Sequence, residues 1–203
     1  MAMPPTVVGL FDTVEHAQQT VQDLLDNGVP RADISLVTRN TRDASPLAPS
    51  TQAADAADRV AAGAFGGGVL GGVLGVLVGV SGLAIPGIGP VLAAGPLASA
   101  IGSALAGAGI GAVSGGLLGA LSAAGVPEEQ AHAYAEGVRR GGSLVAVTTD
   151  AILGSAVYDL MQRHGVVDID VRSAAWRRSG WERFDPNAGP FSRGEPEREQ
   201  QRN

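Results

Sequence analysis

Two residue types are missing from this chain, cysteine and lysine, and each absence excludes a class of chemistry. Without cysteine the protein can have no disulfide, no thiolate nucleophile and no metal centre built on sulfur ligands. Without lysine it can form no lysine Schiff base and no lysine-containing phosphate loop. The 14 basic residues are therefore all arginine, and covalent mechanisms that use a thiolate or a lysine amine are excluded.

Positive charge and aromatic residues are also scarce. The formal net charge is −6, which argues against the basic surface that nucleic-acid binding requires. Two Trp, two Tyr and four Phe are too few for a base-stacking platform. We therefore expect no nucleic-acid partner. The first five residues also lack the basic-then-apolar pattern of a cleavable signal peptide.

Charge is missing altogether from the middle of the chain. Val60–Pro127 spans 68 residues without Asp, Glu, Lys, Arg or His, and twenty of these residues are glycine. Small residues recur there at every fourth position, a spacing that presents a flat helix face to a neighbouring helix. The sequence thus predicts two glycine-zipper ladders for helix packing: Gly63, Gly67, Gly71, Gly75 and Gly79, followed by Ser99, Ser103, Gly107, Gly111, Gly115 and Gly119.

Proline and glycine separate the two ladders at Ile85–Pro96. We therefore predict a glycine-rich α-helical hairpin over residues 60–126, joined at this breaker-rich connector. The uncharged run is long enough for two membrane spans of about 20 residues each. In the alternative, the same hairpin is buried in protein, against a sheet or within an oligomer. The second ladder is poorer in strong hydrophobes than the first, which keeps this alternative open.

The charged sequence before this segment predicts a β-α-β unit over residues 6–39. Residues 6–11 and 33–39 are rich in apolar and β-branched residues, as buried strands are. Between them, apolar residues recur every three or four positions, with Asp12 as the expected N-cap and Gly28 as the expected stop. Residues 40–59 are small, polar and proline-containing, which is typical of a linker.

The charged sequence after it predicts a helix and a second β-α-β unit over residues 127–173. The helix begins at Pro127, with acids in its first turn. A strand over residues 143–149, a helix capped by Asp150 and a returning strand over residues 166–172 follow. Two such units make an α+β fold, the ferredoxin-like split β-α-β sandwich. This fold has a four-stranded sheet with two helices on one face, and here the helical hairpin is inserted between the halves.

The end of the chain, residues 174–203, mixes Arg and Glu with Gly and Pro, a composition that predicts a flexible tail. The tail also contains Trp176, Trp181 and Phe184. Because an inert tail seldom carries such large apolar side chains, we expect this part to dock on the domain or on a partner.

No constellation of residues predicts catalysis, a metal site or a cofactor. Gly66–Gly71 fits the dinucleotide-binding pattern by letter, but it follows no strand, and the next acid is Glu128. Helix capping accounts for Asp12 and Asp150, and a solvated helix end accounts for Arg139-Arg140 better than an anion site does. The three histidines lie on three different predicted helices, without ligand spacing: His16, His132 and His164.

Taken together, these pieces resemble the bacterial general stress protein (heat-induced stress protein) domain family, including its low-temperature-induced relatives. The resemblance extends over nearly the whole chain and implies a stress-associated protein, with no catalytic residues to carry over. The matching stretches are Val7–Asp12 with its helix, Ile85–Pro96, Pro127-Glu128-Glu129 with Tyr134–Gly142, and Trp181–Pro186.

The expected function is that of a non-enzymatic, general stress-associated protein anchored in the cell membrane by the hairpin, with membrane lipid as its partner. If both β-α-β halves share one sheet, both ends of the hairpin emerge on one side of the membrane. Both termini are then expected in the cytoplasm. The alternative is a cytoplasmic, soluble binding or assembly module of the same fold, which forms a homo-oligomer through its zipper or sheet faces.

Overall fold

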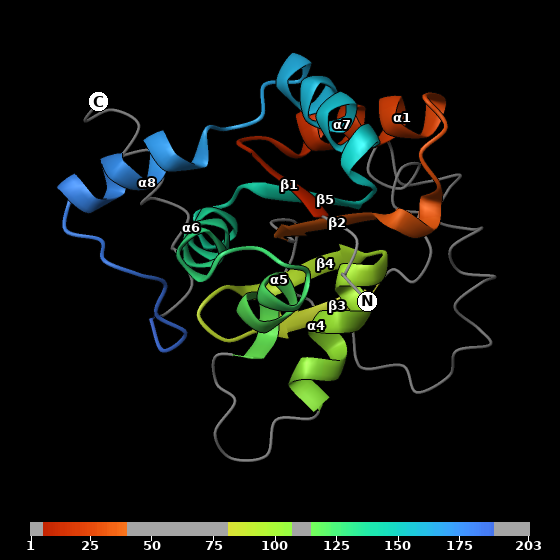
Figure 1. The fold of residues 1–203 in the computed structure, drawn as a ribbon. Helices are drawn as coiled ribbons and strands as arrows, with labels where there is room; N and C mark the ends of the chain where they lie inside the picture. Colours follow the sequence, from red (N-terminus) through yellow and green to blue (C-terminus); the bar gives the residue numbers. More distant parts are fainter. Residues whose placement is uncertain (1–5, 40–80, 107–114, 189–203) are drawn as a thin grey trace.

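The computed structural model describes residues 6–39, 81–106 and 115–188 (Figure 1). These residues form an α+β fold with a five-stranded antiparallel sheet in the order β1-β5-β2-β4-β3. The strands are β1 (Thr6–Phe11), β2 (Ile34–Arg39), β3 (Ser81–Ile85), β4 (Gly89–Ala94) and β5 (Ser143–Thr148).

The first β-α-β unit forms as predicted, from β1, α1 (Val14–Asp26) and β2, with the short 3₁₀ turn η1 (Arg31–Asp33) before β2. Strand β5 lies between β1 and β2 and is antiparallel to both, so β1 and β2 run in the same direction. The unit is therefore a split β-α-β. Its N-cap is Thr13 rather than Asp12, because the Thr13 hydroxyl accepts the bond from the His16 amide at 3.3 Å.

The second unit is incomplete. Strand β5 leads into α7 (Ala151–Arg163), which Asp150 caps as predicted. The predicted strand over residues 166–172 is wrong, because the Asp168 carboxylate caps a new helix, α8 (Ile169–Arg178). A single bridge remains at the predicted position, where the Val167 amide donates to the Leu10 carbonyl at 2.7 Å. The complete ferredoxin-like arrangement is consequently not observed.

Part of the uncharged segment joins the sheet. Strands β3 and β4 form a hairpin, and β4 pairs with β2 from Leu36↔Ala94 to Arg39↔Val91. The predicted helix-to-helix connector at Ile85–Pro96 is thus wrong. The glycines that indicated a break permit a tight β-turn instead: Gly87 and Gly89 have φ values of 78° and 94°, which favour glycine.

After the hairpin the chain forms α4 (Pro96–Ala106), a π-helical turn η2 (Gly115–Gly119), α5 (Ala120–Ala123) and α6 (Glu128–Arg139). The second ladder does not form one continuous helix, because Gly116 has non-helical angles of φ −45° and ψ −113°. In the described parts of the chain, no helix has the length and apolar character needed to cross a membrane.

Helices cover both faces of the sheet (Figure 1). Helices α1 and α7 cover one face, which confirms the two helices predicted there, and Phe11, Leu36 and Val145 point toward them. Helices α4, α5 and α6 cover the other face, where Leu10 and Val37 are buried. Alternate residues of each strand therefore enter two different cores. We call these cores the α1/α7 face and the α4/α6 face.

Candidate functional site

A group of packed aromatic rings, ion pairs and an open cleft lies where α6, α8 and the end of the described chain meet. Residues Ser179–Ala188, which we call the strap, leave α8 and run past α6 to the β3–β4 turn (Figure 1). Phe184 in the strap is only 5% exposed and joins the core of the α4/α6 face. The predicted flexible tail is therefore corrected up to Ala188, and the predicted docking of its aromatic residues is confirmed.

The strap packs directly on the β3–β4 turn. A side chain added at Gly87 would meet the Asp185 carbonyl oxygen and Pro186 Cα, each at 2.8 Å, and Phe184 Cζ at 3.0 Å. Such distances are below ordinary van der Waals contact, so glycine is required for this approach as well as for the turn. The strap and the turn therefore fit only because position 87 has no side chain.

Two tryptophans hold the start of the strap. The rings of Trp176 in α8 and Trp181 in the strap meet edge-to-face, with centroids 5.7 Å apart and an interplanar angle of 74°. The Arg140 guanidinium lies 4.8 Å from the Trp176 ring centroid, and that of Arg177 lies 5.9 Å from the Trp181 centroid. Aromatic and cation–π contacts of this geometry stabilise by about 0.5–1.5 kcal/mol each. The pair joins α6, α8 and the strap.

A buried ion cluster fixes the end of α6. The Glu136 side chain is fully buried and is bonded to Arg139 at 3.2 Å and Arg140 at 2.7 Å. Arg39 at the end of β2 donates to the Arg139 carbonyl at 2.6 Å. Burial, and then the neighbouring Arg139 charge, lower the pKa of Arg39. Arg139-Arg140 is therefore not the solvated helix end that the sequence indicated, but part of a cluster that ties α6 to the sheet.

Tyr134 ties the middle of α6 to β1. Its hydroxyl donates to the Val8 carbonyl oxygen at 3.0 Å. Burial raises the pKa of Tyr134 to about 12, and the nearby acids Asp170 and Asp168 act in the same direction. The phenol is thus held in its neutral, hydrogen-bonding form.

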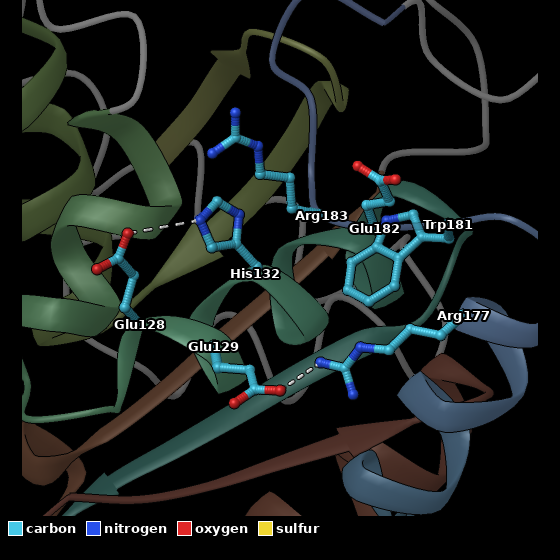
Figure 2. A pocket seen from close by; sticks show the side chains of 7 residues that line it. All are labelled: Glu128, Glu129, His132, Arg177, Trp181, Glu182 and Arg183. Carbon is cyan, nitrogen blue, oxygen red and sulfur yellow. Dashed lines mark hydrogen bonds and ion pairs between the residues drawn. The ribbon is translucent and has the colours of Figure 1, made fainter.

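An open cleft of about 520 Å³ lies between the start of α6, the end of α8 and the strap (Figure 2). Arg177 bonds to Glu129 across it at 2.5 Å, and His132 lies 3.9 Å from Glu128. The lining residues are Glu128, Glu129, His132, Arg177, Trp181, Glu182 and Arg183.

Two nitrogen atoms beside the cleft, His132 Nδ1 and Trp181 Nε1, are buried and have no hydrogen-bond partner among the described residues. The charged groups that line the cleft have both signs, and Glu129 and Arg177 pair across it. This balance favours a polar contact between α6 and the strap over the capture of a strongly charged ligand.

The predicted ladder residues are only partly within the described chain. Gly63, Gly67, Gly71, Gly75 and Gly79 lie outside it, as do Gly107 and Gly111. Ser103 lies in α4, is exposed and bonds to the Ala100 carbonyl at 3.0 Å. Gly115 and Gly119 lie in η2, and a Cβ at Gly119 would meet nothing within 4 Å. The zipper role of the ladders stays a prediction.

The other candidate residues have structural partners. His164 in α7 lies 2.7 Å from Asp23 in α1, while His16 lies in α1 and His132 in α6. No group of residues suited to a metal ion occurs in the part of the chain that the structure describes. Asp12 forms a two-pronged ion pair with Arg172 of α8, at 2.8 and 3.0 Å.

Comparison with known protein families identifies the first part of the chain. Residues 6–83 match the heat induced stress protein YflT domain. The YflT match begins at the start of β1, continues through α1 and β2, and ends inside β3. It confirms over these residues the resemblance predicted from the sequence. Neither the curated proteins nor the solved structures searched contained a significant match.

Proposed function

We propose that this YflT-domain chain is a non-enzymatic, stress-associated assembly module. Residues 81–106 and 115–126 of its uncharged segment complete the domain core, and Val60–Val80 is the element through which copies associate. One observation carries the proposal: β4 pairs with β2, and Leu97 and Ile101 of α4 are buried on the sheet. The two parts of the uncharged segment therefore have separate roles.

Sheet topology favours association between copies of the chain rather than a membrane span. Strands β2 and β3 belong to one sheet, so both ends of the chain between Arg39 and Ser81 lie on the same side of any membrane. An even number of crossings is then required, and two crossings need about 40 apolar residues. The uncharged run from Val60 to Ser81 is about half that length.

Membrane anchoring is the second candidate, and the composition of Val60–Val80 favours it. Ten of these residues are Val, Leu or Phe, enough for favourable insertion of one helix. A membrane hairpin with both predicted arms would need β3, β4 and α4 to leave the sheet. Their departure would expose Val37 and Leu144, which are fully buried. The two candidate functions thus differ in whether β3, β4 and α4 stay packed on the α4/α6 face.

The test compares the intact chain with a variant in which a Gly/Ser linker of equal length replaces Val60–Val80. Mass in detergent-free buffer and recovery after membrane fractionation are measured for both. The assembly proposal expects an oligomer for the intact chain and a folded monomer for the linker variant. Release of the intact chain from membranes only by detergent favours the anchor instead. A monomeric intact chain in detergent-free buffer contradicts the assembly proposal.

The non-enzymatic part of the proposal rests on the cleft. Two of its acids have a partner within the cleft: Glu129 bonds to Arg177, and Glu128 lies 3.9 Å from His132. A catalytic acid or base would instead be expected to have a strongly perturbed environment in a water-excluding pocket. Any reproducible turnover that Glu129→Gln or His132→Ala abolishes, without loss of folding, would overturn this part.

A further inference from the structure

We propose that the strap is a latch: it keeps the β3–β4 hairpin on the sheet, and its release frees this hairpin. The strap meets the hairpin at the Gly87 turn, where atoms of Phe184, Asp185 and Pro186 lie within 3.0 Å of a Cβ added at Gly87. The turn lies at the Val91 end of β4, just beyond the terminal β2–β4 pair Arg39↔Val91. A contact there can hold or release the hairpin without altering the β1-β5-β2 part of the sheet.

The attachment of the strap is strong at one end and slight at the other. At its start, the Trp181 amide bonds to the Trp176 carbonyl at 3.0 Å and the two rings pack edge-to-face. Toward its end, Phe184 is the one strap side chain that is nearly fully buried among the described residues. The strap can therefore leave the turn by extracting one side chain, while Trp176 remains anchored on α8.

The hairpin lies at the edge of the sheet. Strand β3 pairs with β4 alone among the described strands, and β4 pairs with β2 over four residues. The hairpin places Ile85, Ile88 and Val91 in the core, but Gly, Ala and Pro make up more than half of residues 81–94 and contribute less buried side-chain area. Local opening of one element costs less free energy than unfolding of the whole domain. An added clamp at the turn accordingly controls whether this element stays in place.

The latch can be tested with single thiols, because the chain has no cysteine of its own. Ala93→Cys places a thiol in β4 on the α4/α6 face, and Ala17→Cys places one in α1 on the α1/α7 face. Both alanines are fully buried. Each thiol is combined with Phe184→Ala, with Phe184→Asp, and with the control Tyr158→Ala, which removes a half-exposed aromatic ring from α7.

Alkylation rates then distinguish a latch from general destabilisation. The latch expects Phe184→Ala to raise the rate at Ala93→Cys about tenfold or more, with Phe184→Asp stronger, because the hairpin opens locally. The rate at Ala17→Cys should stay unchanged. Equal increases at both thiols would mean that the strap only adds global stability, which overturns the latch. Unchanged rates at Ala93→Cys in both Phe184 variants overturn it as well.

Release of the strap should also affect association between copies of the chain. This consequence rests on the proposed function and is measured separately. Phe184→Asp should then raise the fraction of chain in oligomers in detergent-free buffer. Local opening at Ala93→Cys without any change in association would leave the latch standing and contradict Val60–Val80 as the association element.

Discussion

The two faces of the sheet are built from different kinds of sequence. Helices α1 and α7 on one face carry charges, side-chain N-caps at Thr13 and Asp150, and regularly spaced apolar residues. On the other face, α4, η2 and α5 come from sequence without a single charge, and α6 is tied down by a buried Glu–Arg cluster. The α1/α7 face is stabilised mainly by amphipathic helices, and the α4/α6 face by specific interactions such as the buried Glu–Arg cluster. The described stretches of the uncharged segment, residues 81–106 and 115–127, therefore supply core residues to the α4/α6 face.

The largest expected effect comes from removing the uncharged part of the α4/α6 face. Replacing residues 81–126 with a Gly/Ser linker would expose Val37, Leu144 and Ala146 on the sheet, and we expect cooperative unfolding to be lost. Thermal unfolding followed by circular dichroism measures this. The matched control replaces Val60–Val80 by a linker and should keep the transition. A cooperative transition in the 81–126 variant would show that the α1/α7 face folds alone.

The next effect comes from the buried ion cluster. Glu136→Ala leaves Arg139 and Arg140 without their fully buried carboxylate, so we expect a loss of ~3–5 kcal/mol in the free energy of unfolding. Urea denaturation gives this value. Glu128→Ala removes a side chain on the same helix that is 89% exposed and should change stability by less than about 0.5 kcal/mol. Equal effects of the two substitutions would contradict the role of the cluster.

A matched pair of glycines compares the two faces directly. Gly95 between β4 and α4 has φ 86°, and Gly28 after α1 has φ 85°. A methyl group at Gly95 would overlap the Ile34 carbonyl oxygen, whereas one at Gly28 would meet nothing within 4 Å. We expect a cost of roughly 2–4 kcal/mol for Gly95→Ala and about 1 kcal/mol for Gly28→Ala in urea denaturation. Similar costs would mean that only backbone conformation matters at Gly95.

The sequence predicted the α1/α7 face well because its signals are local. Apolar spacing and Asp150 marked the helices, and β-branched runs marked β1, β2 and β5. The strand expected over residues 166–172 failed because Asp168 caps a helix in the same β-branched run, and propensity alone does not separate the two outcomes. The run Leu144–Val147 carried a further signal, since consecutive buried residues indicate a strand covered on both faces.

The α4/α6 face was not predictable because the interactions that stabilise it join residues far apart in the sequence. Gly87 and Gly95 marked breaks, but only the packed structure shows that a strap and the β2 backbone pass beside them. Spacing of three and four residues from Glu136 to Arg139-Arg140 did indicate pairing, although not that the carboxylate is buried. The docking of Trp176 and Phe184 followed from their size alone, while its location on α6 and the β3–β4 turn did not.

The smallest effect depends on pH and comes from the α6 tie to β1. Because the pKa of Tyr134 is raised to about 12, the folded chain keeps this proton at pH values where the unfolded chain has lost it. The contribution is complete below the unfolded value near 10 and is lost as pH rises toward 12, amounting to about 1.4 kcal/mol of lost stability at pH 11. Tyr134→Phe should remove this part of the alkaline slope in urea denaturation.

At neutral pH the same Tyr134→Phe substitution should cost only about 1 kcal/mol, for the lost bond to the Val8 carbonyl. Tyr158→Phe on the α1/α7 face removes a hydroxyl from a half-exposed ring and should leave the alkaline slope of the parent chain in place. If Tyr134→Phe and the parent chain lose stability equally between pH 10 and 12, burial of this phenol against β1 is not the source of the pH dependence. The loss of stability between pH 10 and 12 would then have to arise from titratable groups other than Tyr134.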